Sequence, residues 1–174
     1  QLTSAIPDLP AGLQSFAANN NRLSGAVPDL PAGLQLFAAN DNRLTGSIPA
    51  LPATLVQFEV DSNQLTGAIP TLPNGLLLLR ANDNQLSGPI PTLPSSLVLL
   101  AVSNNQLSGP IPTLPAGLEN LTVANNQLTG ALPAAPAALE PSQSTLCPNL
   151  FDTPYTADPA WDAATGSTPW SAAC

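Results

Sequence analysis

Apolar side chains recur along this chain with a step of 21 residues, and the step is kept to about residue 140. Within one step, the stretch LQLFAANDNRL at 34–44 has Leu34, Phe37, Ala39 and Leu44 at its inward positions. Phe37 and Ala39 are separated by one residue, which is the period of two of a short β-strand. The pattern therefore predicts one short strand in every step.

A unit of this length cannot bury an apolar face alone, so successive units must stack and share one core. An asparagine column and a glycine column keep the same step. Their members are Asn21, Asn42, Asn63, Asn84, Asn105 and Asn126, with Gly25, Gly46, Gly67, Gly88, Gly109 and Gly130. We expect each asparagine amide to satisfy backbone groups where the chain leaves the strand. We expect each glycine to serve a bend with positive φ or a close backbone contact.

The second half of each step is rich in proline, as in SGPIPTLPAGL at 108–118. Proline fixes φ near −65° and moves the preceding residue out of the α region. A helix is therefore not expected here, and an extended, polyproline-like return is. The predicted fold is a mainly β repeat solenoid, with one short parallel strand per turn and an extended, proline-rich, non-helical return leg.

These motifs carry a family resemblance. LxxLxLxxNxL followed by Leu44-Thr45-Gly46-Ser47-Ile48-Pro49 resembles the leucine-rich repeat proteins, especially the plant-type class with LTGxIP. The added LPxxL, as at 51–55, resembles the short repeats of bacterial effector proteins. The resemblance covers about residues 1–140 and implies a right-handed solenoid. It says little about function, because that family includes receptors, inhibitors, adhesins and effectors.

Two parts are expected: a solenoid over 1–140 with six asparagine-bearing units, starting in the middle of a repeat, and a C-terminal cap over 141–174. An open N-terminal edge would be covered by further repeats or a partner chain, or would tolerate exposure as a frayed half-repeat. The C-terminal part holds both tryptophans, which either cap the last repeat or stack on a ligand. Cys147 and Cys174 are expected to form a disulfide, which favours a secreted or cell-surface protein.

Composition narrows the function further. Charged residues are 8% of the chain, the net charge is −8, and the three cationic side chains are Arg22, Arg43 and Arg80. Nucleic acids and anionic membranes both need basic surfaces, and no apolar run is long enough to span a bilayer. Histidine and lysine are missing, which removes the usual catalytic bases, and the clusters of cysteine or histidine that bind zinc are also missing. Neither an enzyme nor a zinc site is therefore expected, and no cofactor is predicted.

Outward columns of the strands are where the steps differ most, so they are the expected ligand-binding surface for a protein, peptide or cell-surface glycan. The candidate ligand-binding residues are Leu36, Asp41, Glu59, Asp61, Leu78, Arg80, Asp83 and Leu99. Exposed leucines on a strand suggest a contact surface, although they could also pack on one another across strands. Glu59 and Arg80 are one step apart and are expected side by side.

Two local alternatives concern the same surface. Asp41, Asp61 and Asp83 fall at the strand-to-turn edge and would either bind calcium or form a solvated acidic rim. Asn120-Leu121-Thr122 is the only N-glycosylation sequon, and its asparagine is expected to point outward.

A second surface follows the return leg and carries hydroxyl columns on an uncharged background. Its members are Thr45, Thr66, Ser87, Ser108, Thr129, Thr71, Thr92 and Thr113. Regular hydroxyl ladders resemble those of ice-binding solenoids, whereas hydroxyls in turns commonly bond to the backbone. The predicted function is an extracellular recognition module; the alternatives are an ice-binding or surface-adhesion protein and a structural spacer.

Overall fold

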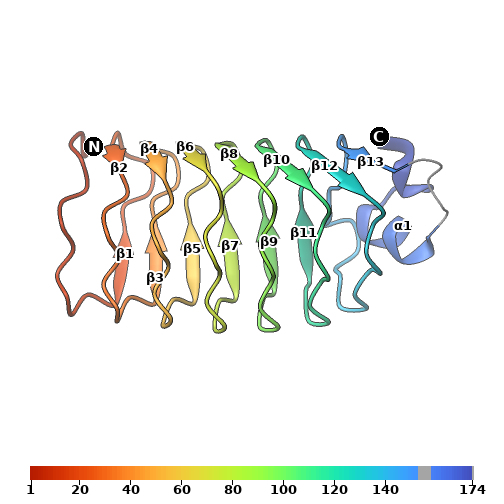
Figure 1. The fold of residues 1–174 in the computed structure, drawn as a ribbon, viewed down its shortest axis with the longest axis horizontal. Helices are drawn as coiled ribbons and strands as arrows, with labels where there is room; N and C mark the ends of the chain where they lie inside the picture. The colour runs from red at the N-terminus through yellow and green to blue at the C-terminus, as the bar shows by residue number, and fades with distance from the viewer. Residues whose placement is uncertain (153–157, 174) are drawn as a thin grey trace.

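Two parallel sheets run the length of the molecule in this computed structural model, which describes residues 1–152 and 158–173. The first sheet has six strands, in the spatial order β1 (Ser15–Ala17), β3 (Leu36–Ala38), β5 (Gln57–Glu59), β7 (Leu78–Arg80), β9 (Leu99–Ala101) and β11 (Asn120–Thr122). Equivalent residues pair directly, as in Phe16 with Phe37 and Phe37 with Phe58. The stacked strands therefore confirm the predicted solenoid (Figure 1).

A second sheet of seven strands forms at the start of the return leg, where the sequence pattern predicted no strand. It contains β2 (Ser24–Ala26), β4 (Arg43–Ser47), β6 (Gln64–Gly67), β8 (Gln85–Gly88), β10 (Gln106–Gly109), β12 (Gln127–Gly130) and β13 (Leu150–Phe151). The prediction of one strand per turn was therefore incomplete. The rest of each return leg is non-helical, as its prolines require, and it ends in a turn, as where the Leu55 N–H donates to Pro52 O.

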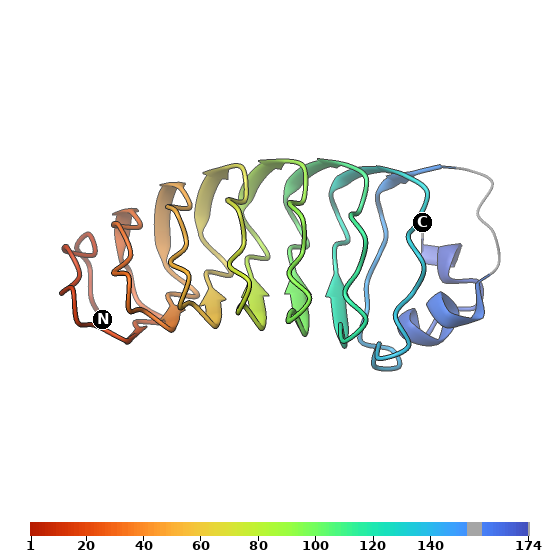
Figure 2. The same ribbon diagram turned by 60° about the horizontal axis from the view of Figure 1, so that its bottom comes forward.

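Pairing in the second sheet is staggered by two residues relative to the repeat. Thr45 pairs with Gln64 and Thr66 pairs with Gln85, a separation of 19 rather than 21 residues. Figure 1 shows these strands slanted against the upright strands of the first sheet. In Figure 2 the two sheets lie on different sides of the molecule. The stagger means that a hydroxyl of one turn lies beside a glutamine of the next.

The interior between the sheets is filled by the columns that the sequence pattern assigned to it. Leu34, Phe37, Ala39 and Leu44 have no exposed surface, which confirms their inward positions. The rings of the first phenylalanines stack along the axis: the centroids of Phe37 and Phe58 are 5.4 Å apart. Each fully buried leucine or phenylalanine contributes about 1.5–3 kcal/mol through removal from water.

The asparagine column makes the backbone contacts predicted for it. Asn63 Oδ1 accepts the Leu44 N–H at 2.9 Å, and its Nδ2 donates to carbonyls of its own turn and of the preceding turn. Asn84 repeats the arrangement one turn later. Each amide thus ties two turns together where the strand hydrogen bonds end.

A second polar column beside it also links neighbouring turns. Asn40 Oδ1 accepts the Asp61 N–H, and Asn82 Oδ1 accepts the Ser103 N–H. At Ser103 the side chain is too short to continue this series, and its buried hydroxyl has no hydrogen-bond partner.

Backbone conformation explains the glycine column. Gly25, Gly46, Gly67, Gly88, Gly109 and Gly130 all have φ between 76° and 80°. An L side chain is strained in this left-handed region, whereas glycine is not. The expectation of positive φ is confirmed.

Features of the solenoid continue beyond residue 140. Asn149 takes the role of the column asparagine: its Oδ1 accepts the Leu128 N–H at 2.9 Å, and its Nδ2 donates to Val123 O. Thr145 forms a parallel bridge with Thr122. Asn149 follows Asn126 by 23 residues, two more than the step, and this insertion hides the turn from a search at a fixed period.

Beyond this turn, α1 (Pro159–Thr165) and the 3-10 helix η1 (Trp170–Ala173) lie at the C-terminal end of the stack (Figure 2). Asp158 caps α1 by accepting the Ala160 N–H. Trp161 is 1% exposed, and its indole N–H donates to Pro133 O at 3.1 Å. The helix thereby attaches to the return leg of the preceding turn.

Candidate functional site

The candidate site is the outward side of the first sheet, together with the residue before each strand and the turn after it. We call this surface the sheet face. Leu36, Leu78 and Leu99 lie on it and are partly exposed, as predicted. Leu78 pairs with Leu99 in the strand register, so these two side chains are direct neighbours. Small residues flank these leucines, for example Ala38, which lies two residues after Leu36 and is buried.

A further set of apolar residues on this face was not identified from the sequence. Leu77 precedes β7 and is 41% exposed, and Val56 and Val98 hold the same position in the adjoining turns. Their backbones are joined, because the Leu77 N–H donates to Val56 O and the Val98 N–H donates to Leu77 O. Gln14 and Gln35 occupy this column in the first turns. The change from glutamine to valine or leucine was the signal that could have identified it.

Glu59 and Arg80 are neighbours in the register of β5 and β7, as the repeat predicted. Both residues are described by the structure, and their side chains do not form a salt bridge with each other. Glu59 Oε2 instead accepts a hydrogen bond from Asn40 Nδ2 at 3.2 Å. The Arg80 guanidinium is left available on the sheet face.

Asp61 is the most perturbed carboxyl of the sheet face. Its Oδ1 accepts the Asn82 N–H at 2.7 Å. Burial raises the pKa of Asp61 above its usual value, and the Glu59 and Asp83 charges add to this rise, while that hydrogen bond and the Arg80 charge lower the pKa only in part. Burial thus disfavours the charged form of this carboxyl, because water solvates it poorly there.

Asp41 and Asp83 have a conformational role in the turns after the strands. Their φ angles are 56° and 54°, and Asn20, Ser62, Asn104 and Asn125 share this left-handed conformation. Asparagine and aspartate tolerate it better than most residues. Asp83 Oδ1 also accepts a hydrogen bond from Asn104 Nδ2. Within the part of the chain that the structure describes, no three acidic, histidine or cysteine side chains gather as a metal site.

The sequon lies on the last strand of the sheet face. Asn120 and Thr122 are both partly exposed on β11. A glycan at Asn120 stays a prediction.

Hydroxyl residues of the return leg lie on two different surfaces. Thr45, Thr66 and Thr129 are exposed on the second sheet, and Ser87 and Ser108 are partly exposed there. Because of the stagger, they alternate with glutamines instead of stacking on one another.

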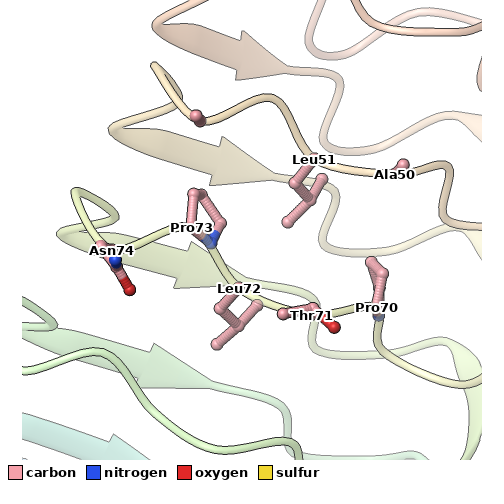
Figure 3. A pocket seen from close by; sticks show the side chains of 8 residues that line it. Ala50, Leu51, Pro70, Thr71, Leu72, Pro73 and Asn74 are labelled. Carbon is pink, nitrogen blue, oxygen red and sulfur yellow. The ribbon is translucent and has the colours of Figure 1, made fainter.

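The second hydroxyl set consists of Thr71, Thr92 and Thr113. Each of these threonines is exposed and directly follows a proline that recurs with the 21-residue step. Thr71 lines a shallow groove of about 520 Å³ between two successive return legs, together with Leu51, Leu72 and Pro73 (Figure 3). No charged side chain lines this groove.

A smaller cavity of about 170 Å³ lies between the last turn and the C-terminal helices, lined in part by Ser144, Cys147 and Trp170. Trp170 is 4% exposed. Cys174 lies outside the described residues, so its pairing with Cys147 stays a prediction. No described helix has both the length and the hydropathy needed to cross a membrane.

Comparisons with known proteins identify the class of fold. No protein-family profile and no curated sequence matches the chain. Among solved structures, the plant peptide hormone receptor RGFR1 in complex with RGF2 is similar over 86% of this chain, with 28% identity and a TM-score of 0.74. The leucine-rich repeat ectodomain of the Arabidopsis receptor kinase HAESA, in complex with an IDA peptide hormone, is similar over 81% of the chain, with 32% identity and a TM-score of 0.70.

YopM from Yersinia enterocolitica is similar over 87% of the chain, with 33% identity and a TM-score of 0.64. The chain thus has the fold of the leucine-rich repeat proteins. It spans 27%, 26% and 33% of the three matched chains, in the order given.

Proposed function

We propose that this chain is a recognition module that binds an extended segment of a protein or peptide along the sheet face. The observation that carries the proposal is the apolar surface formed by Val56, Leu77, Leu78, Val98 and Leu99. Core packing does not require apolar residues there, and contiguous exposed apolar surface is typical of contact sites.

Two further observations support the proposal. The RGFR1 and HAESA structures are complexes with peptide ligands, and both are similar in fold to this chain over most of its length. The proposed module works without catalysis: RGFR1 is a peptide hormone receptor, and the HAESA structure is the leucine-rich repeat ectodomain of its receptor kinase. We place it outside the cytoplasm, at the cell surface or secreted, because of the expected cysteine pair.

The proposal is tested with a displayed peptide library and a glycan array, both probed with the wild-type chain and with the double variant Leu77→Ala/Leu78→Ala. The matched control is Gln64→Ala/Gln85→Ala on the second sheet, where both side chains are exposed. We expect peptide binders that the sheet-face variant loses and the control retains, while thermal stability stays nearly unchanged. Binding to glycans alone would refute a protein or peptide as the ligand. Peptides that bind the sheet-face variant as well as wild type would refute the sheet face as the binding site.

A second candidate function uses the second sheet. From Gln64 to Thr129, its outward glutamines, serines and threonines form an uncharged polar surface over four strands. Such a surface suits ice binding or adhesion to a neutral polymer. An ice-recrystallisation assay with wild type and Thr66→Arg separates this candidate from the first. If the sheet face binds no ligand and the second sheet shows no ice-recrystallisation activity, the structural spacer is the remaining candidate function.

A further inference from the structure

We propose that the segment bound on the sheet face is cationic as well as apolar: leucine-like side chains contact Leu77, Leu78 and Leu99, and a lysine or arginine side chain contacts Glu59 and Asp61. This inference rests on the proposed function and specifies the chemistry of the partner.

The apolar half of the surface is continuous across three turns. Leu77 is one of three exposed large hydrophobic side chains in the described residues, and the other two, Leu2 and Leu150, lie in the first and last turns. Leu77 is therefore not explained by an unfinished end of the stack. Neighbouring parallel strands lie about 4.8 Å apart. Leu78 and Leu99 consequently form a short apolar strip that alternate side chains of an extended peptide could cover.

The charged half lies diagonally next to this strip: Gln57 pairs with Leu78, and Glu59, two residues further along β5, pairs with Arg80. The column of Glu59 otherwise contains alanine and threonine, apart from Arg80. Folding thus does not require a long charged side chain at either position, which points to a role in binding.

Asp61 departs from its column in the same way. Asn19, Asn40 and Asn82 hold the equivalent positions and make the same bond to the next turn through Oδ1. A neutral amide satisfies that bond without placing a charge in a poorly solvated position. A cationic group of a ligand would offset this unfavourable burial of the Asp61 carboxylate.

The sign of the charge determines which partner fits. Glu59, Asp61 and Asp83 outnumber Arg80 on this part of the sheet face, and Arg80 forms no salt bridge within the described residues. An acidic peptide would be repelled by three carboxylates, and with a neutral one only Arg80 and the Asn82 N–H would offset the burial of the Asp61 carboxylate. Complementary charge across an interface also speeds association and suppresses wrong partners.

The experiment selects random 12-residue peptides on the immobilised wild-type chain and determines their Kd by fluorescence anisotropy. Glu59→Gln/Asp61→Asn removes two negative charges from the sheet face. The matched control, Asp8→Asn/Asp29→Asn, removes two exposed negative charges from the return leg. Leu77→Ser/Leu78→Ser tests the apolar strip, and thermal unfolding shows that each variant is folded.

We expect selected peptides that combine lysine or arginine with leucine-like residues. Their affinity should fall about tenfold or more in Glu59→Gln/Asp61→Asn, fall with rising salt, and stay within about twofold of wild type in the control. Acidic or uncharged peptides that depend on the apolar strip would overturn this inference and leave the proposed function standing. Equal losses in the two charge variants would also overturn it. Selection of no peptide that depends on Leu77 and Leu78 would refute the proposed function itself.

Discussion

Asn63→Leu tests whether the buried amides hold successive turns together. Asn63 is 9% exposed, and leucine has a similar size and branching, so the change removes hydrogen bonds with little change in volume. The Leu44 N–H loses its bond to Asn63 Oδ1, and Leu44 has no exposed surface through which water could replace it.

The carbonyl partners of Asn63 are less affected because each has another donor. Ala39 O also accepts from Asn42 Nδ2, and Val60 O also accepts from Asn84 Nδ2. The unpaired Leu44 N–H costs about 1–3 kcal/mol, and the lost amide–carbonyl bonds add about 1 kcal/mol. The free energy of unfolding should therefore fall by about 2–4 kcal/mol, a large share of the 5–15 kcal/mol typical of a domain.

Urea denaturation followed by circular dichroism measures this loss. Asn21→Leu is the control, because Asn21 bonds the N–H of Leu2, which is 57% exposed and can bond to water instead. We expect Asn21→Leu to cost less than about 1 kcal/mol. Equal losses at the two positions, or a loss below about 1 kcal/mol at Asn63, would refute the reasoning.

The remaining predictions concern stability at other positions. Gly67→Ala should cost about 1–2 kcal/mol because φ is 78°, whereas Gly75→Ala, which meets no atom within 4 Å, should be nearly neutral in the same urea experiment. Asp61→Asn should raise Tm at pH 7. The raised pKa of Asp61 favours its protonated form in the folded state, so the wild type loses stability as pH rises from about 3.8 through the folded pKa. The Tm values of the two proteins should converge below that range. A variant with no gain at pH 7 would contradict the burial effect. Ser103→Asn should extend the second polar column and raise stability by about 0.5–1.5 kcal/mol, and a loss would show that the amide does not fit. If residues 141–174 cap the stack, as expected from the sequence, Trp161→Ala should cost about 3–5 kcal/mol by urea denaturation, and a loss below about 1 kcal/mol would contradict that role.

Most of the solenoid could be predicted from spacing alone. A constant step of 21 residues identifies equivalent positions, and burial of Leu34, Phe37 and Leu44 follows because each unit needs its neighbours to cover its apolar side. The asparagine and glycine columns were equally predictable, since an amide at the end of a strand and a glycine at a bend have few other uses.

The sheet face was predictable only in part. Leu36, Leu78 and Leu99 alternate with core residues and so had to face outward. Leu77 was missed because it lies before the strand, where alternation gives no direction. The bond between Glu59 and Asn40 was also missed, because spacing places side chains next to each other without choosing among possible partners.

The sequence by itself determined which residues share the interior, because a strict repeat leaves only one way to stack its leucines. Tertiary structure alone decided the second sheet, its two-residue stagger and the continuation of the stack at Asn149. The physical reason is that pairing between turns depends on the angle at which each return leg crosses its neighbour. That angle is set by the whole packed turn, and no local sequence pattern specifies it.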